Sequence, residues 1–253
     1  FGGHKPPTIV SAAACLIKTP KLFGQLEEGS HPISIKSRRY SNIDKTFIRA
    51  EVKKLLKAGI IKECESPWRA QVLVHQGNEN HKKRLVIDYS QTINRFTKLD
   101  AYPVPRIDEM VEEISKRKYY STLDLSSAYH QVPIAEDEQE YTAFEADGKL
   151  YCFMFIPFGV TNGVSAFQRT VNDIIAAEHL SGVYVYVDNI TIVGMTKEEH
   201  DNNLSEFLTA AAKYNLEFND SKTVSGVTSI KLLGYLVSHN SIKPDPDRVK
   251  PLL

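Results

Sequence analysis

The chain has 253 residues, 42% of them hydrophobic, so it can bury a substantial core as one large domain or two smaller ones. Its 31 basic residues balance 31 acidic residues, which excludes a global attraction to a polyanion and requires any nucleic-acid contact to use local patches. No run of the sequence approaches the roughly 18 apolar residues of a membrane span. Three widely separated cysteines, Cys15, Cys64 and Cys152, favour reduced thiols in an intracellular compartment over a disulfide framework or a zinc site.

The first third of the chain contains one helical and one hairpin pattern. Residues 1–40 are rich in proline, glycine and serine and predict an irregular, loosely attached leader. From Ser41 apolar residues recur at helical spacing until Gly59, which predicts an amphipathic helix. Strands predicted over 68–75 and 84–89 enclose a polar, basic loop and indicate a projecting hairpin. Because the sequence starts at a phenylalanine, we expect a piece of a longer polypeptide.

The middle of the chain alternates between helical and strand patterns. A helix is predicted over 107–114, followed by a strand over 119–124. Alternating runs around an Asp-Gly pair indicate a hairpin over 142–155. A helix over 167–175 comes next, so hairpins and helices follow one another and the fold class is α+β.

The last third contains a second tight hairpin. Strands predicted over 183–187 and 190–193 have almost nothing between them, so Asp188 and Asn189 are expected to occupy a tight turn. The remaining predicted elements are a helix over 204–211 and one strand over 231–237.

Asp124 and Asp188 both lie where a predicted strand meets solvent. If the two strands share a sheet, both carboxylates reach one rim and repel each other unless a cation lies between them. Mg²⁺ fits, because it prefers one or two carboxylates together with substrate phosphates, and a pair of ions could stabilise an in-line phosphoryl displacement. The alternative is that each aspartate is present only for its turn geometry.

Several motifs in one order carry a family resemblance. They are RLVIDYSQTIN, YYSTLDLSSAYHQVPIAEDEQEYTAFEADGKLY, FIPFGVTNGVSAFQRTVNDII, YVYVDNITIVG and LLGYLVSHNSIKPDP. From about Ser41 to the C-terminus the chain resembles the reverse transcriptase of Gypsy-type LTR retrotransposons. The resemblance implies an RNA-directed DNA polymerase that adds deoxynucleotides to a primer 3′-hydroxyl.

The resemblance assigns a metal site and a sugar contact. It implies that Asp124 and Asp188 bind metal through their carboxylates and Leu125 through its backbone carbonyl. Tyr129 matches the bulky residue that stacks under the incoming sugar and excludes a 2′-hydroxyl. From the residues alone, a tyrosine of the core is the alternative.

The resemblance also assigns contacts to the nucleotide. Arg84 matches the arginine that contacts the triphosphate, and Lys82 or Lys83 could supply a second charge, the choice being open. Phe158 and Gly159 fall where the family lines the nucleotide and template pocket. Without the resemblance, the basic loop would be interpreted as a solvated turn.

Further roles follow at the end of the chain. Lys222 matches a lysine suggested to protonate the leaving pyrophosphate, and Tyr186, Gly234 and Tyr235 are implied to contact the primer. Asp88 corresponds to a structural position, and we exclude it from the metal site.

Two departures from the family pattern bear on activity. Asn189 stands where the family usually has a second adjacent aspartate, which removes one charge but leaves a carbonyl oxygen for a metal or a water. The predicted catalytic set is therefore Asp124, Asp188, Asn189 and Lys222. Few residues follow Pro244, so we expect the chain to stop before the helical thumb. The alternative to an active polymerase is an inactive or co-opted remnant that only binds nucleic acid or has a structural role.

The sequence thus predicts the fingers and palm of a right-hand polymerase, with an antiparallel palm sheet backed by helices. The predicted boundaries are a leader over 1–40, fingers over 41–110 with part of 140–160, and a palm over 111–253. The implied cofactor is a pair of Mg²⁺ ions, with Mn²⁺ as a substitute. Expected partners are an RNA or DNA template-primer, deoxynucleoside triphosphates and the RNase H and integrase domains of a parent polyprotein, with no membrane. A cytoplasmic virus-like particle and the nucleus both stay open as compartments.

Overall fold

The chain divides into two compact units. The computed structural model describes residues 18–77 and 82–249, so 1–17 of the predicted leader and the hairpin tip at 78–81 lie outside the described residues. Unit 1 consists of Phe1–Ala101 and Tyr129–Ala166, and unit 2 consists of Tyr102–Ala128 and Phe167–Leu253. Each unit is therefore built from two separate stretches of sequence.

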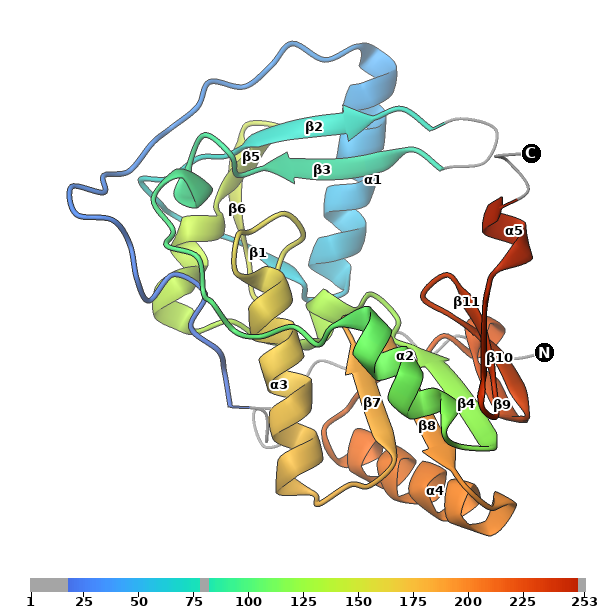
Figure 1. Ribbon diagram of the computed structural model, residues 1–253. Helices are drawn as coiled ribbons and strands as arrows, with labels where there is room; N and C mark the ends of the chain where they lie inside the picture. Colours follow the sequence, from blue (N-terminus) through green and yellow to red (C-terminus); the bar gives the residue numbers. More distant parts are fainter. Residues whose placement is uncertain (1–17, 78–81, 250–253) are drawn as a thin grey trace. The chain divides into compact units, whose positions relative to one another are not determined.

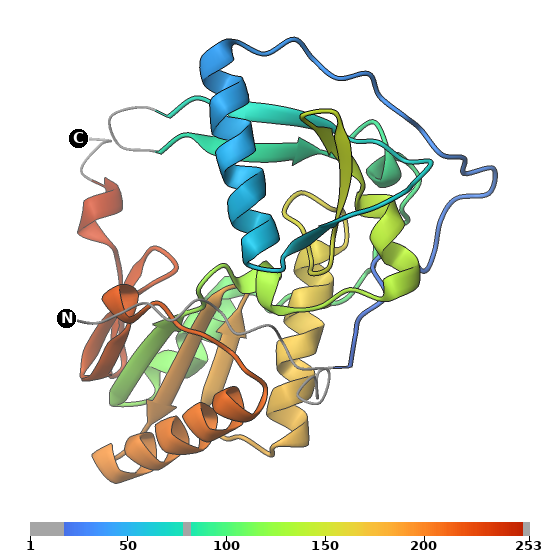
Figure 2. The same ribbon diagram turned by 180° about the vertical axis from the view of Figure 1, so that it is seen from behind.

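Unit 1 contains two small antiparallel sheets and one long helix. Its elements are α1 (Asn42–Lys57), β1 (Ile61–Glu63), β2 (Gln71–His75), β3 (Arg84–Asp88), η1 (Ile93–Arg95), η3 (Glu136–Thr142), β5 (Phe144–Ala146) and β6 (Lys149–Phe153). β2 pairs with β3, and β1, β6 and β5 lie side by side in that order. α1, blue in Figure 2, contacts β1 and β5. These elements confirm the predicted first helix and both predicted hairpins.

Local chemistry explains where these elements begin and turn. The side chain of Ser41 accepts the N–H of Asp44 and caps α1. Asp147 and Gly148 have φ of 52° and 78°, the pair of positive values that a two-residue hairpin turn requires.

Residues 18–40 form neither helix nor strand, yet the segment is anchored. Leu22 and Phe23 are buried, and their N–H groups donate to the carboxylate of Glu138 at 2.7 and 3.1 Å. Burial raises the pKa of Glu138, although these N–H groups favour its charged form. For residues 18–40 the expectation of loose attachment is wrong, because buried apolar side chains hold a segment that lacks regular structure.

Unit 2 is a four-stranded antiparallel sheet with helices and a smaller sheet. Its elements are α2 (Ile107–Ser115), β4 (Tyr119–Asp124), α3 (Gly163–Ala177, whose first turn belongs to unit 1), β7 (Val183–Tyr186), β8 (Asn189–Gly194), α4 (Lys197–Lys213), η4 (Asp220–Lys222), β9 (Val224–Val227), β10 (Ser229–Leu232), β11 (Tyr235–Ser238), β12 (Ser241–Pro244) and α5 (Pro246–Val249). The sheet order is β7-β8-β4-β9, and β10, β11 and β12 form the second sheet (Figure 1). η2 (Ala128–Gln131) spans the boundary between the units.

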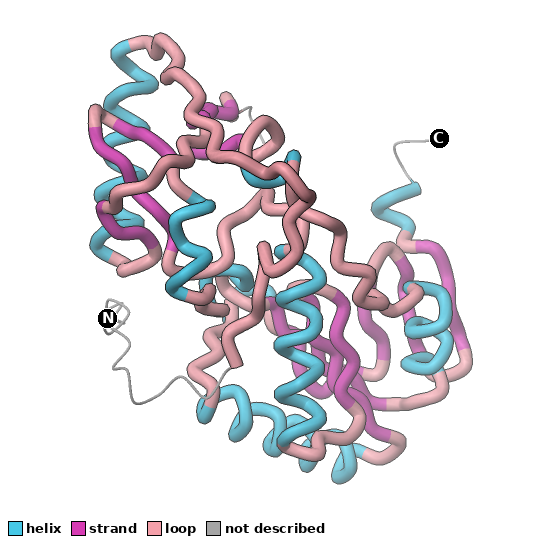
Figure 3. Tube along the Cα trace, turned by 90° about the vertical axis from the view of Figure 1, so that its left-hand side faces the viewer, coloured by secondary structure: helices cyan, strands magenta, loops and turns pink. Residues whose placement is uncertain are grey.

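Helices and the second sheet back the palm-like sheet of unit 2. α4 contacts β8, β4 and β9, and α2 contacts β7 and β11. Figure 3 shows helices (cyan) running beside the strands (magenta). One buried cluster joins α2, β4, β8 and the second sheet through Met110, Val111, Ile114, Tyr120, Val193, Ile230, Leu232 and Val237. This arrangement confirms the predicted α+β class and fixes the ends of β4 and β8 relative to each other.

Two predicted details of unit 2 are wrong. The tight turn consists of Val187 and Asp188, whereas Asn189 pairs with Asp124 and belongs to β8. The single strand expected over 231–237 is a hairpin, because Leu233 and Gly234 have φ of 48° and 94° and reverse the chain between β10 and β11. In both places the turn contains an apolar residue with positive φ, so the pattern of apolar residues did not indicate a turn there.

Candidate active site

Asp124 and Asp188 lie at the same end of the unit 2 sheet. Asp124 ends β4 and pairs with Asn189, the first residue of β8. The N–H of Leu125 donates to the backbone oxygen of Asp188 at 3.3 Å. Because β4 and β8 are antiparallel neighbours, the end of β4 adjoins the β7–β8 turn, and the two acids come from adjoining chain segments.

The segment after β4 is held on its other side as well. The N–H of Asn219 donates to the backbone oxygen of Asp124 at 2.8 Å, and the N–H of Ser126 donates to that of Glu217 at 3.0 Å. The backbone around Leu125, including the carbonyl implied as a metal ligand, is therefore fixed from both neighbouring segments.

The Asp124 carboxylate contacts a cation of the chain itself. Lys222 Nζ lies 3.2 Å from Oδ1 and 3.3 Å from Oδ2 of Asp124, and the lysine side chain is 62% exposed. An exposed ion pair of this kind contributes little to stability. The contact matters because it places an ammonium group beside one of the two acids.

Asn189 lies beside the second acid. Its Nδ2 donates to Oδ1 of Asp188 at 3.2 Å. The amide therefore orients the Asp188 carboxylate and keeps its own carbonyl oxygen as an acceptor.

Gln168 is a residue of the site that sequence reasoning missed. It is fully buried on α3, where Oε1 accepts the N–H of Val187 at 2.9 Å and Nε2 donates to the backbone oxygen of Val185 at 3.1 Å. Val187 has φ of 53°, a strained conformation for a β-branched residue. The glutamine thus stabilises the turn that carries Asp188. A glutamine on the apolar face of a predicted helix was the available signal.

The cations predicted in unit 1 differ in their partners. Lys83 Nζ lies 2.6 Å from Oδ1 of Asp44 and 5.1 Å from the centre of the Phe47 ring, so it is tied to α1. Lys83, with further hydrogen bonds, lowers the pKa of Asp44 to about 2. Lys82 and Arg84 are both exposed.

Aromatic rings gather around Tyr129. Phe158 is 56% exposed and meets the rings of Tyr129 and His130 edge-on, each at 5.1 Å between centroids. His130 also stacks on Phe153 at 5.9 Å, and burial lowers its pKa to about 4, so the ring is neutral near pH 7. The sequence predicted two of these rings, Tyr129 and Phe158, and missed His130.

Gly159 and Asp88 are held by backbone and side-chain hydrogen bonds. Gly159 has φ of 89°, and its carbonyl accepts Nδ2 of Asn94 at 2.7 Å. Asp88 Oδ1 accepts both the N–H and the hydroxyl of Ser90, at 3.0 and 2.6 Å, which makes it a turn-forming carboxylate.

The residues assigned to the primer lie in unit 2. Tyr186 ends β7 opposite Asn189, and it packs with Tyr235 against the buried cluster. Gly234 forms the turn before Tyr235, and its carbonyl accepts the N–H of Asp245 at 2.9 Å.

The acid end is the end of the unit 2 sheet that carries Asp124 and Asp188. Its oxygen ligands supply part of what a hard divalent cation needs. Within 18–77 and 82–249 there is no group of three or more His, Cys, Asp or Glu side chains that could hold a metal ion. Two carboxylates, an amide oxygen and a backbone carbonyl are oxygen ligands of the kind that Mg²⁺ accepts when phosphates and waters complete the shell. The residues therefore fit a metal that arrives with its substrate better than one held by protein alone.

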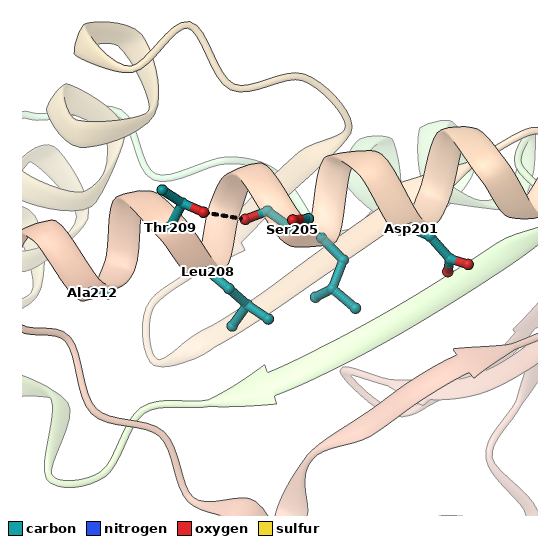
Figure 4. A pocket seen from close by; sticks show the side chains of 6 residues that line it. Asp201, Ser205, Leu208, Thr209 and Ala212 are labelled. Atoms are coloured by element: carbon teal, nitrogen blue, oxygen red, sulfur yellow. Dashed lines mark hydrogen bonds between the residues drawn. The ribbon is translucent and has the colours of Figure 1, made fainter.

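Two surface grooves of unit 2 lie away from this site. One runs along the outer face of α4, where Asp201, Ser205, Leu208, Thr209 and Ala212 line it (Figure 4), and another lies between α2, α3 and β7. None of the predicted site residues lines either groove. No helix in the described part of the chain is both long and apolar enough to cross a bilayer.

Two acids at one end of an antiparallel sheet backed by helices match the palm arrangement that the resemblance predicted. The reverse transcriptase (RNA-dependent DNA polymerase) family profile matches residues 75–237, and the chain belongs to this family. Its members generally depend on a divalent metal.

Curated relatives place the chain among retrotransposon sequences. It is 36% identical over 211 residues to the retrovirus-related Pol polyprotein from transposon gypsy of Drosophila melanogaster, covering 81% of this chain and 20% of that polyprotein. It is 33% identical to the Pol polyprotein from transposon opus of the same fly, covering 87% of this chain and 22% of the relative. The chain thus spans about a fifth of these relatives, which are consistent with a Gypsy-type reverse transcriptase.

Solved structures share the fold. The foamy viral protease-reverse transcriptase in complex with RNA/DNA hybrid matches with a TM-score of 0.80 at 22% identity, covering 94% of this chain and 32% of that chain. The same viral protein in complex with dsDNA matches with a TM-score of 0.79 at 22% identity, covering 93% and 48%. The α+β palm-and-fingers fold is therefore shared with these structures.

Proposed function

We propose that this chain forms the catalytic part of an RNA-directed DNA polymerase, which adds deoxynucleotides to a primer 3′-hydroxyl on an RNA or DNA template. The observation that carries the proposal is the register of β4 and β8, which puts Asp124 beside the turn that carries Asp188. Two acids at one end of a sheet, in a chain of this family, are what two-metal phosphoryl transfer requires.

Each unit has a part in this proposal. Unit 2 is the palm and supplies the acids, and unit 1 supplies the fingers with Arg84. Unit 1 includes 129–166, whereas the predicted fingers take only part of 140–160, and unit 2 includes 102–110, which the prediction gave to the fingers.

The carboxylates of Asp124 and Asp188, the carbonyl of Leu125 and the amide oxygen of Asn189 would hold a pair of Mg²⁺ ions, with Mn²⁺ as a substitute. When bound, the ions neutralise developing charge on the attacking and leaving oxygens. Lys222 Nζ, already beside Asp124, would donate a proton to the leaving pyrophosphate.

The triphosphate and the sugar would be bound by residues of unit 1. Arg84 and Lys82 are exposed and can neutralise phosphate charge, whereas Lys83 is already paired with Asp44. Tyr129, supported by the edge of Phe158, would exclude a 2′-hydroxyl, and Gly159 would lie along the same pocket.

The remaining partners follow the same reasoning. Tyr186, Gly234 and Tyr235 would contact the primer end. RNase H and integrase domains of the parent polyprotein would accompany the chain, since its relatives are Pol polyproteins about five times its span.

Primer extension tests the proposal. The full polypeptide that contains this chain is incubated with oligo(dT) on poly(rA), dTTP and Mg²⁺ or Mn²⁺. We expect extension that stops when the metal is chelated and that is absent from the Asp124→Asn variant. Extension by neither metal with the unmodified polypeptide would rule out polymerase activity.

A further inference from the structure

A buried histidine joins three elements of unit 2. His200 of α4 has no exposed surface, and its Nε2 lies 2.8 Å from Oγ of Ser121 on β4. Its Nδ1 lies 2.9 Å from Oδ1 of Asp201, the next residue of α4, whose side chain is 49% exposed. Hydrogen bonds from Lys197 and then from His200 lower the pKa of Asp201. Because an ionised carboxylate only accepts, Nδ1 carries its proton toward Asp201, and Nε2 faces Ser121.

This Ser-His-Asp order resembles a hydrolase triad, but its surroundings give it another role. Ser121 is as fully buried as His200, so no substrate reaches it. Its Oγ also accepts the N–H of Gly226 at 3.0 Å and lies 3.2 Å from Oγ of Ser225. A hydroxyl has a single proton to donate, so the Ser121 proton is shared between His200 Nε2 and Ser225 Oγ, while the oxygen accepts the Gly226 N–H.

The serine hydroxyl completes an irregular place in the sheet. Tyr120 of β4 pairs with Val227 of β9, and Thr122 pairs with Val224. Two steps along β4 therefore correspond to three steps along β9, which is a β-bulge. Gly226 lies in this bulge with φ of 66°. Because a bulge leaves a residue without its ladder partner, the hydroxyl that accepts the Gly226 N–H fixes how β9 lies against β4.

The bulge is close in sequence to the proposed catalytic groups on both strands. Ser121 precedes Asp124 by three residues on β4, and Lys222 lies two residues before β9 begins at Val224. The distance between Lys222 Nζ and the Asp124 carboxylate therefore depends on how β9 is seated on β4. We propose that His200 is a positioning residue, which holds Ser121 and through the β9 bulge keeps Lys222 beside Asp124. This inference rests on the proposed role of Lys222 in the polymerase reaction.

Two substitutions separate positioning from simple stability. In His200→Gln the side-chain amide reaches the place of Nε2 and keeps a partner for Ser121. In His200→Asn it reaches only the place of Nδ1, keeps Asp201 and loses Ser121. Both remove the ring, so they are matched for its loss. We expect His200→Gln to retain most of kcat and His200→Asn to lose about tenfold or more, with the KM for dNTP nearly unchanged, because small misplacements of reacting groups are costly.

A double-mutant cycle with Lys222→Met, in the full polypeptide, tests whether the effect acts through the lysine. We expect His200→Asn to have little further effect once Lys222 is replaced. An equal loss of kcat with and without Lys222, or equal losses in the Gln and Asn variants, would overturn the proposal.

Hydrogen exchange provides a readout that does not need activity. The Gly226 amide should exchange faster in His200→Asn than in His200→Gln, whereas the β2–β3 amides should exchange equally in both. Equal exchange at Gly226 would overturn the positioning role even if the polymerase is active. If the unmodified polypeptide fails to extend primers but this difference is seen, the structural link stands and the proposed function fails.

Discussion

The acid end of unit 2 and the basic hairpin of unit 1 are held in different ways. Around Asp188 the turn is fixed by the buried Gln168, and behind Asp124 the strand is fixed by the buried contacts of Ser121. In the basic hairpin, by contrast, Lys82 and Arg84 are exposed, and only Lys83 is held, by a partly buried ion pair with Asp44 and by contact with the Phe47 ring. Buried polar networks fix geometry because an unsatisfied member is costly, whereas surface pairs leave side chains free to move. Groups that share a metal need buried polar networks to fix their positions. Groups that neutralise a phosphate can do so as mobile surface side chains.

The largest effect should come from the acids themselves. Asp124→Asn or Asp188→Asn should lower primer extension by about 10³-fold or more, since metal ions supply several kcal/mol of transition-state stabilisation. The matched control is Asp88→Asn, whose side-chain oxygen can still accept from Ser90. Single-turnover extension rates of the three variants check this, and equal losses in all three would contradict the assigned metal site.

Loss of Gln168 should have the next largest effect, and it tests whether buried support matters at the turn. Gln168→Leu leaves the N–H of Val187 without its partner in a strained turn, so we expect about 10²-fold lower kcat and roughly 1–3 kcal/mol lower stability. Gln168→Glu keeps the acceptor for Val187 and should lose less activity. Extension rates and denaturant melts measure the two quantities. If Gln168→Leu loses stability but keeps its kcat, the geometry of the turn does not matter for catalysis.

Tyr129 tests the nucleotide side of the comparison. Tyr129→Val should raise ribonucleotide incorporation relative to deoxynucleotide by roughly 10- to 100-fold, because removing the ring opens space for a 2′-hydroxyl. Tyr129→Phe keeps the ring and should retain the discrimination. The measurement is the ratio of kcat/KM for UTP to that for dTTP. An unchanged ratio in the valine variant would mean that another residue excludes the 2′-hydroxyl.

Asn189→Asp should make the acid end depend more strongly on metal. The change replaces the Nδ2 donor to Asp188 with a third carboxylate, so the metal-free variant should melt a few degrees lower. Added Mg²⁺ should narrow or reverse the difference by binding the folded state, and primer extension should rise. Thermal melts of both proteins with and without Mg²⁺ test this. If the difference in melting temperature is the same with and without Mg²⁺, residue 189 lies outside the coordination sphere of the metal.

The smallest effect should be the pH dependence of the basic hairpin's ion pair. The pKa of Asp44 is lowered from 3.8 to about 2, chiefly by Lys83, so its contribution to stability is present above the higher value and lost as the pH falls toward the lower. Asp44→Asn should therefore reduce stability slightly at pH 5 and much less at pH 2. Melts of both proteins at the two pH values measure this, and a difference that does not shrink on acidification would argue against the pair.

The sequence by itself determined the elements that carry chemistry. The strand ending on Asp124, the helix capped by Ser41 and the Asp-Gly hairpin were predicted because each depends on local periodicity or on turn residues with a known preference. The order of motifs was sufficient to indicate the family. The roles of individual residues came from that resemblance and stay predictions until the experiments above are done.

Only the tertiary structure decided how these residues are supported. The hydrogen bond between His200 and Ser121 joins elements 79 positions apart in the sequence, and those of Gln168 join α3 to the β7–β8 turn. A polar residue on an apolar helix face was the only local signal, and it does not indicate which group the side chain binds. Asn189 was misplaced because a valine occupies the left-handed position of the turn, where propensity favours glycine or asparagine. The bulge at Gly226 depends on how β9 lies against β4, and strand register is a property of the assembled sheet. Local sequence specifies strands and turns, whereas the positions of their ends relative to one another are set by packing and buried hydrogen bonds.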